Sequence, residues 1–162
     1  MIKLNSMRIL EQRGIPHEAL EYNSSFHNAE EVAEVLGLPY AMLYKTLVVQ
    51  VIGNSSQAKS LLVLIPSQDQ LNLKKMAAAA GVKKVKMASH ADAERLTGLQ
   101  VGGISPLALM DKNWPVFLDR QATTLPHIVI SGGQRGVQIR LPVAPLVSLL
   151  RVRIVDVSES KS

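Results

Sequence analysis

The chain has 162 residues, of which 47% are apolar and only 4% aromatic, and it contains no cysteine. This length is that of one ordinary domain, and its core must be aliphatic. The lack of cysteine excludes a disulfide framework, a thiolate metal site and a cysteine nucleophile. The net charge of +5 fits either a protein that binds a polyanion such as nucleic acid or a merely solvated surface, and composition leaves both interpretations open.

The first residues lack the apolar stretch of a secretory signal, and no run approaches the ~20 apolar residues of a membrane span. We therefore expect a cytoplasmic protein with no membrane partner. The pattern of apolar residues predicts one mixed α/β domain over residues 1–157, without repeats or linkers. The remaining residues, 158–162, are polar and are expected to form a frayed tail.

Apolar periodicity, helix caps and glycine or proline stops divide the chain into five helices and eight strands. The first half contains a helix at 2–12, a strand at 15–22, a helix capped by Asn28 and stopped by Gly37, and strands at 43–52 and 61–65. The second half contains a helix at 74–80, a strand at 82–87, a helix capped by Ser89 and stopped by Gly98, strands at 116–118, 127–130 and 137–141, a helix at 144–150 and a strand at 152–155. The strands at 43–52 and 61–65, joined by a turn at 53–56, should be antiparallel neighbours.

The most informative motif is the pentapeptide from Gly102 to Pro106. Adjacent glycines permit positive φ and let a ligand approach the main chain closely. Pro106 fixes its own φ and pushes Ser105 toward an extended conformation. The motif therefore predicts a rigid loop whose N–H groups point at an acyl carbonyl or phosphate oxygen, with a simple turn as the alternative.

A second glycine corner, Ser131-Gly132-Gly133, directly follows a predicted strand. It is either a hairpin turn or a further source of hydroxyl and N–H groups for one shared pocket. Lys45 is the candidate cation, because period-2 alternation places it on one strand face with Leu47 and Val49. An inward ammonium requires an anion, carbonyl groups or a ligand. Because the opposite face is also apolar, an exposed lysine at the strand's start is the alternative.

No other cluster supplies an obvious catalytic group. The four histidines are far apart and lack metal-ligand spacing, so we interpret them as surface or packing residues: His17, His27, His90 and His127. No carboxylate pair and no nucleophile motif stands out. Two glycine loops, one lysine and no nucleophile suggest catalysis by positioning and oxyanion stabilisation, with a substrate that supplies its own nucleophile or uses water.

These motifs resemble the family of YbaK and prolyl-tRNA-synthetase-associated aminoacyl-tRNA deacylases, from about Met7 to Val157. The segments that carry the resemblance are Tyr44-Lys45-Thr46-Leu47, Leu73-Lys74-Lys75, Gly81-Val82-Lys83-Lys84-Val85, Thr97-Gly98, residues 101–107 and Ser131-Gly132-Gly133. The glycine loop is most similar to that of the YbaK branch, the cysteinyl-tRNA(Pro) deacylases. The resemblance implies a mixed, mostly antiparallel, barrel-like sheet surrounded by helices, with a pocket at its mouth.

The implied function is editing in trans: hydrolysis of the ester between a wrong amino acid and the tRNA 3′ end, chiefly cysteine on proline tRNA. The implied mechanism is substrate-assisted, with the cysteine thiol attacking its own ester carbonyl and leaving as a thiolactone. By resemblance, Lys45, Gly102 and Gly103 are the catalytic residues. The implied substrate-binding residues are Tyr22, Thr46, Ile104, Ser105, Pro106, Ser131 and Gly132.

We expect no metal and no cofactor. The resemblance implies the aminoacyl-tRNA 3′ end as one partner and prolyl-tRNA synthetase, as the source of tRNA identity, as another. Gln134 and Gln138 stand where the YbaK branch tends to carry a lysine and an aspartate, which leaves alanine and serine open as the amino acid removed. A non-catalytic module that binds aminoacyl-tRNA or a synthetase, and a generic polyanion-binding domain, are the alternatives from other classes.

Overall fold

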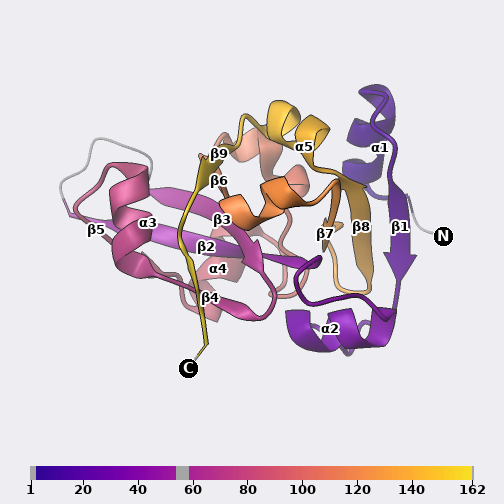
Figure 1. The fold of residues 1–162 in the computed structure, drawn as a ribbon, viewed down its shortest axis with the longest axis horizontal. Helices are drawn as coiled ribbons and strands as arrows, with labels where there is room; N and C mark the ends of the chain where they lie inside the picture. The colour runs from indigo at the N-terminus through magenta and orange to yellow at the C-terminus, as the bar shows by residue number, and fades with distance from the viewer. Residues whose placement is uncertain (1–2, 54–58, 162) are drawn as a thin grey trace.

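The computed structural model describes residues 3–53 and 59–161, which form three β-sheets with helices around them (Figure 1). The largest sheet has the strand order β5-β2-β3-β6-β9. Its members are β5 (Lys84–Met87), β2 (Tyr44–Ile52), β3 (Ser60–Pro66), β6 (Val116–Asp119) and β9 (Arg153–Val155). Strand β2 is antiparallel to both β3 and β5, whereas β6 is parallel to β3 and to β9.

The two smaller sheets are antiparallel throughout. One has the order β1-β8-β7, built from β1 (Glu18–Glu21), β8 (Val137–Pro142) and β7 (His127–Ser131), and the other pairs β4 (Asp69–Leu71) with β10 (Ser158–Ser160). A parallel bridge between Leu43 and Val129 links the three-stranded sheet to the start of β2. The mixed, mostly antiparallel sheet arrangement expected from the resemblance is thus confirmed.

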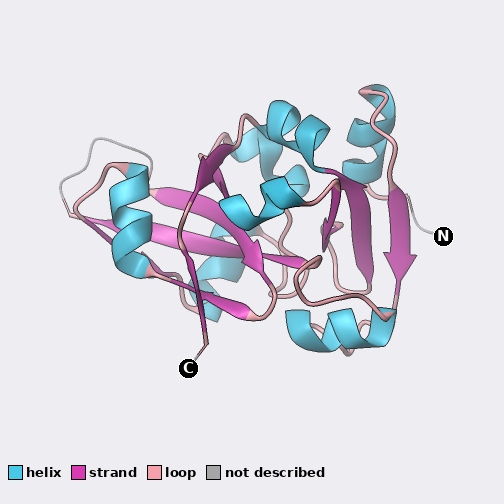
Figure 2. Cartoon of the chain, viewed as in Figure 1, coloured by secondary structure: helices cyan, strands magenta, loops and turns pink. Residues whose placement is uncertain are grey.

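Five α-helices and two short 3₁₀ helices lie around the sheets in the described part of the chain (Figure 2). They are α1 (Asn5–Gln12), α2 (Ala29–Leu36), α3 (Leu73–Ala80), α4 (His90–Thr97), η1 (Leu107–Lys112), η2 (Arg120–Thr124) and α5 (Val143–Leu150). Asn28 and Ser89 cap α2 and α4 by accepting main-chain N–H bonds, and Gly37 and Gly98 end these helices with positive φ. These caps and stops were predicted from the sequence. No described helix has both the length and the apolar character needed to cross a membrane.

Strand β3 is buried along its whole length because apolar clusters cover both faces of the large sheet. One cluster, which includes Leu62 and Leu64, packs residues of β2, β6, β8, α1, α4 and α5 together. The other, which includes Leu61 and Val63, packs against α3. Leu47, Val49 and Val51 belong to this second cluster, so the predicted alternation along β2 is confirmed.

Most predicted elements are present within one to three residues of their expected bounds, including the antiparallel pair β2 and β3. Helix α1 begins at Asn5; the predicted start at Ile2 and residues 54–56 of the predicted turn lie outside the described residues. The strand predicted at 15–22 is shortened to β1. These differences lie at element ends, where local signals are weakest.

The prediction of a frayed tail is wrong for residues 158–160, which form β10 against β4. The Asp119 carboxylate accepts the N–H groups of Val157 and Ser158 at 3.1 and 3.0 Å. The Gln121 side chain donates to Ser158 Oγ at 2.8 Å and to Asp69 Oδ2 at 3.0 Å. Long-range hydrogen bonds, rather than local sequence, therefore order the C-terminal segment.

Candidate active site

A cavity of about 300 Å³ lies where the start of β2 meets the starts of α2 and α4, the first glycine loop and the β7–β8 hairpin. This volume is at the lower end of small-molecule sites. The residues that line it are His27, Asn28, Ala29, Val32, Leu43, Tyr44, Lys45, Thr46, Leu47, His90, Val101, Gly102, Ile104, Ser131 and Gln138. The structure therefore brings Lys45 and both glycine corners around one space.

Lys45 lines this cavity from β2 and is half-buried. Burial is the main cause that lowers the pKa of Lys45, and the like charge of Lys161 lowers it further, while Glu30 and Asp69 oppose the shift. Lys161 itself forms an ion pair with Glu30. Among the ion pairs between described residues, none includes Lys45. Its ammonium is thus partly desolvated and is not neutralised by a direct carboxylate contact, which is the situation of a cation that awaits an anionic or carbonyl ligand.

Thr46 lines this cavity from the start of β2. The Val48 carbonyl accepts a 3.0 Å bond from the Ala88 N–H, just beyond the paired part of β5. Residues two apart in a strand direct their main-chain groups to the same side, so the N–H and C=O of Thr46 point to the edge that β5 leaves open. The start of β2 therefore offers a main-chain donor and acceptor that have no partner within residues 3–53 and 59–161.

The first glycine loop approaches the α2 side of the cavity through Gly102. This residue has φ of +91°, and an added Cβ would lie 2.5 Å from the His27 Cβ and 2.9 Å from its carbonyl oxygen. Glu94 Oε2 of α4 accepts the Val101 N–H at 2.8 Å and fixes the start of the loop. Only glycine fits here, both for its positive φ and for the contact with His27.

Gly103, the second glycine of the loop, is required for a different reason. Gly103 does not have positive φ, but an added Cβ would lie 2.8 Å from the Gln134 Cα and 2.9 Å from the Arg135 nitrogen. Its N–H donates to the Gln100 carbonyl at 2.8 Å, so the expectation that this amide faces a ligand is wrong. Among the described residues, no group accepts a hydrogen bond from the Gly102 or Ile104 N–H, and both residues line the cavity.

Ser105 and Pro106, expected to bind substrate, support the loop from behind. Ser105 is fully buried, and its Oγ accepts the Leu107 N–H at 3.1 Å. Pro106 precedes η1 as its N-cap residue. Neither residue lines the cavity, and the chain continues into η1 directly after Pro106.

The two glycine corners are bound to each other. Arg135 Nε, from the β7–β8 turn, donates to the Val101 carbonyl at 2.6 Å. Ser131 lines the cavity, and its Oγ accepts the Gly133 N–H at 3.2 Å. Gly132 is used inside the hairpin: its N–H donates to Val137 at 2.9 Å, and its carbonyl accepts from Ser6 Oγ at 2.6 Å. The second corner is therefore both a hairpin turn and a cavity wall, and Ser131, although buried, is the residue of this corner that lines the cavity.

Tyr22 and Gln138 act as a pair. Gln138 is buried and lines the cavity, and its Nε2 donates to the Tyr22 hydroxyl at 3.2 Å. Tyr22 itself does not line the cavity. The Gln138 Oε1 and the Thr46 Oγ1 are buried and have no hydrogen-bond partner among the described residues. A buried oxygen without a hydrogen-bond partner destabilises the protein. These two lining residues can therefore each accept a hydrogen bond from a polar ligand.

Two histidines that line the cavity, His27 and His90, were not predicted as site residues. Both were interpreted as surface or packing residues, yet His27 lies against Gly102 and His90 is the first residue of α4 at the cavity. Each lies next to a predicted helix cap, Asn28 and Ser89 respectively. That position was the available signal, because the N-termini of helices often face polar ligands.

Comparison with known proteins identifies the family. Residues 23–149 match the family described as the aminoacyl-tRNA editing domain. The chain is 36% identical over 158 residues to EbsC of Enterococcus faecalis, a candidate Cys-tRNA(Pro)/Cys-tRNA(Cys) deacylase, and the match covers 96% of this chain and 93% of EbsC. The chain belongs to the aminoacyl-tRNA editing domain family. This confirms the enzyme class expected from the sequence, an aminoacyl-tRNA deacylase.

Other relatives share the fold or a part of the sequence. The crystal structure of hypothetical protein APE2540 has a TM-score of 0.85 and 28% identity, covering 96% of this chain and 99% of that one. A candidate trans-editing enzyme for prolyl-tRNA synthetase has a TM-score of 0.80 at 23% identity, covering 99% and 100%, and shows a common fold. The proline–tRNA ligase of Limosilactobacillus fermentum is 29% identical over 85 residues, which are 52% of this chain and 15% of the ligase.

Proposed function

We propose that this protein removes cysteine from mischarged proline tRNA by cleaving the ester at the tRNA 3′ end. The observation that carries the proposal is the convergence of Lys45, Gly102 and Ser131 on one cavity in a chain that belongs to an editing family. The similarity to EbsC, whose name gives Cys-tRNA(Pro) as a substrate, supports cysteine as the amino acid. The cavity suits an aminoacyl group and the ribose that carries it.

The substrate supplies the nucleophile in the proposed reaction. The cysteinyl sulfur forms a bond to the carbonyl carbon of its own ester, and the bond from that carbon to the ribose oxygen breaks. The thiol proton is transferred to the departing ribose oxygen, so the products are a cysteine thiolactone and a tRNA with a free 3′ hydroxyl. Water then opens the thiolactone to free cysteine. This mechanism requires no cysteine or activated serine of the protein, and the chain has no cysteine.

The residues of the cavity would act on the geometry and charge of this reaction. The N–H groups of Gly102 and Ile104, which have no acceptor among the described residues and belong to residues that line the cavity, are suited to the oxygen that becomes negative as sulfur attacks. The Lys45 ammonium would hold the terminal adenosine end and add positive charge beside the leaving oxygen. Ser131 and Gln138 would close the opposite wall. Holding thiol and carbonyl close together lowers the barrier by several kcal/mol.

The choice of tRNA would come from a partner. The similarity to part of a proline–tRNA ligase supports a complex with prolyl-tRNA synthetase that delivers proline tRNA to this cavity. In such a complex the synthetase recognises the tRNA, while this chain reads the aminoacyl group. We infer a cytoplasmic location from the same association with translation.

The test is hydrolysis of purified Cys-tRNA(Pro), with Ala-tRNA(Pro), Ser-tRNA(Pro) and S-methylcysteinyl-tRNA(Pro) as comparisons. We expect rapid loss of the cysteinyl ester and a rate near the no-enzyme control for the S-methyl ester, whose sulfur cannot cyclise. Equal cleavage of the S-methyl ester would show that water, and not the substrate thiol, is the nucleophile. An unchanged half-life of every ester, with retention of the charged tRNA, would instead identify a non-catalytic binding module.

A further inference from the structure

The net positive charge of the chain is concentrated in one segment. Residues 72–90 contain five lysines and no acidic residue, whereas the rest of the chain carries 13 basic and 13 acidic residues. The five lysines are Lys74, Lys75, Lys83, Lys84 and Lys86. Positive charge is therefore a property of α3, β5 and the loop between them, and the remainder of the protein is balanced.

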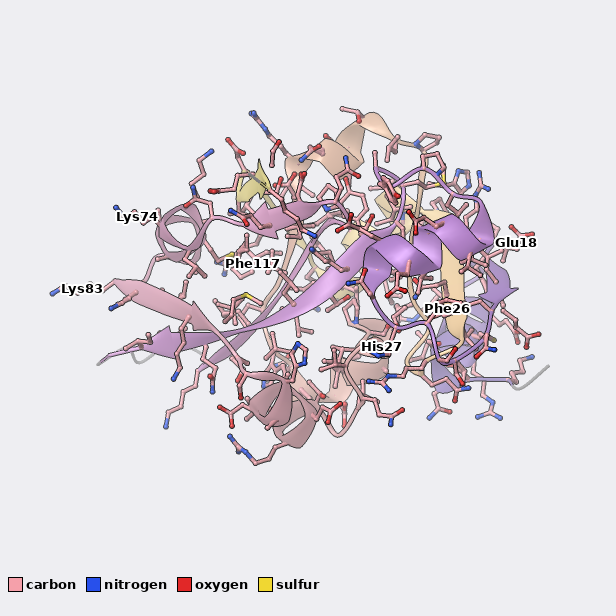
Figure 3. All side chains as sticks on the ribbon, turned by 90° about the horizontal axis from the view of Figure 1, so that it is seen from below. Glu18, Phe26, His27, Lys74, Lys83 and Phe117 are labelled. Atoms are coloured by element: carbon pink, nitrogen blue, oxygen red, sulfur yellow. The ribbon has the colours of Figure 1, made fainter. Side chains whose placement is uncertain are left out.

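These lysines are all exposed. Lys75 approaches Asp156 at 3.7 Å, but Arg120 also approaches that carboxylate, at 3.6 Å. None of the other four lysines forms an ion pair with any residue that the structure describes. Figure 3 shows Lys74 and Lys83 together at the end of the molecule opposite Glu18. This end thus carries a dense, unneutralised positive charge.

The strand β5, which carries part of this charge, leads along the chain to a residue of the cavity. It is an edge strand of the large sheet, and Lys84 and Lys86 lie opposite Ile52 and Gln50 of β2, which places them on one face. Their Cα atoms are about 6.6 Å apart. Strand β5 leads into α4, whose first residue, His90, lines the cavity. Three residues lie between Lys86 and His90, so their Cα atoms, four Cα–Cα steps apart, are at most ~14 Å apart.

We propose that Lys83, Lys84 and Lys86, here called the lysine edge, bind the phosphates of the acceptor strand of the tRNA whose aminoacyl end occupies the cavity. This inference rests on the proposed function, because the cavity fixes where the tRNA 3′ end begins. Exposed ammonium groups bind a phosphate backbone by releasing its counterions, without reading bases. The chain has only 4% aromatic residues, so it lacks the stacking platform of a protein that reads single-stranded bases.

The test compares two variants that each lose two positive charges. Lys84→Gln/Lys86→Gln changes the lysine edge, and Arg8→Gln/Arg13→Gln changes exposed arginines at α1, which lies at the opposite end from β5 (Figure 1). For each, kcat/KM is measured on Cys-tRNA(Pro) and on 3′-cysteinyl adenosine, from about 50 to about 200 mM salt. Binding of uncharged tRNA is measured over the same range.

We expect the lysine variant to lose about tenfold in kcat/KM on the tRNA at low salt, and its salt dependence to be shallower by ~1.5 in log–log slope for two lost phosphate contacts. Activity on the adenosine ester should stay within twofold, and the arginine variant should match wild type on both substrates. Equal tRNA affinity of the two variants would contradict phosphate binding by the lysine edge. These lysines would then serve only to prevent the edge strand β5 from pairing with another chain. A lysine variant that loses affinity only for prolyl-tRNA synthetase would also contradict phosphate binding.

The same experiment separates this inference from the proposed function. A wild-type protein that cleaves neither ester contradicts the deacylase proposal, while tRNA binding still decides whether the lysine edge holds phosphates. A wild-type protein that cleaves both esters, with a lysine variant of unchanged tRNA activity and salt slope, contradicts the lysine edge alone.

Discussion

The cavity and the lysine edge use positive charge in opposite ways. The cavity has one lysine, Lys45, which is half-buried and has a lowered pKa. The lysine edge has three lysines that are exposed and unpaired by any described acidic group. A partly desolvated cation interacts strongly with a negatively charged atom held nearby. The interactions of exposed cations, in contrast, are screened by salt. Changes in the cavity should therefore affect any ester, and changes at the lysine edge should affect only an ester carried by a tRNA.

The largest effect is expected from Gly102→Ala, because the added Cβ would lie 2.5 Å from the His27 Cβ and the residue has φ of +91°. Either the loop or the His27 segment must move, and a shift of about 1 Å in a catalytic site can lower the rate ~100-fold. We expect this loss in kcat/KM on both Cys-tRNA(Pro) and 3′-cysteinyl adenosine. A loss confined to the tRNA would break the comparison between the two regions.

Gly14→Ala is the matched control for this prediction. Gly14 also has positive φ, +67°, but an added Cβ would meet nothing within 4 Å. This variant should lose about 1–2 kcal/mol of unfolding free energy through the left-handed conformation alone. Its kcat/KM should be that of wild type, as measured beside its thermal unfolding curve.

The second prediction concerns the cavity's cation. Lys45→Ala should lower kcat/KM at least tenfold, ~1.4 kcal/mol of transition-state stabilisation, on both esters and at every salt concentration. Lys86→Ala, which removes an exposed lysine, should leave the adenosine ester unaffected. Activity of Lys45→Ala within twofold of wild type would remove Lys45 from the proposed mechanism.

Sequence reasoning succeeded where the cause of the structure is local. The caps Asn28 and Ser89, the antiparallel pair β2 and β3, and the face on which Lys45 lies each follow from residues that are close in the chain. The concentration of lysines in residues 72–90 can likewise be counted without coordinates. The resemblance to the editing family then added the association of Lys45 with the two glycine corners.

What the sequence missed depends on residues far apart in the chain. The strand β10 exists because Asp119 and Gln121 hold Ser158, and no pattern within 158–162 indicates this. The presence of His27 at the cavity depends on its contact with the glycine loop, 75 residues later. The glycine loop itself was predicted. The reasons why its two positions require glycine could not be, because they depend on contacts with His27 and with Gln134 of the β7–β8 turn.

A smaller effect is expected at Gln138, whose amide joins Tyr22 to the cavity wall. Gln138→Leu keeps the volume and removes the polar group, so the Tyr22 hydroxyl loses its donor. The ligand would also lose a possible hydrogen bond to the Gln138 Oε1, which has no partner among the described residues, and the loss of one bond of about 1 kcal/mol should raise KM for the adenosine ester about fivefold. Gln138→Glu retains a hydrogen-bonding partner for Tyr22 and should stay nearer to wild type. Equal KM values for the leucine variant and wild type would make this pair a purely structural contact.

The smallest predicted effect is a shift of the pH profile by substitution at Lys161. Lys161 lowers the pKa of Lys45 and Glu30 raises it. If the protonated Lys45 is the active form, kcat/KM falls as the pH rises through its lowered pKa. Lys161→Gln should then move this alkaline limb to higher pH, by less than about one unit. Glu30→Gln should move it to lower pH.

These two shifts have opposite signs because Lys161 and Glu30 carry opposite charges. The two residues form an ion pair, so removing either partner leaves the charge of the other acting on Lys45. The profile is measured with 3′-cysteinyl adenosine, after subtraction of the uncatalysed hydrolysis at each pH. The small substrate excludes the lysine edge from the result, so a movement of the limb reports the half-buried cation alone. Shifts in the same direction for both variants would show that the limb belongs to another group, and Lys45 would then be a binding residue whose protonation does not control the rate.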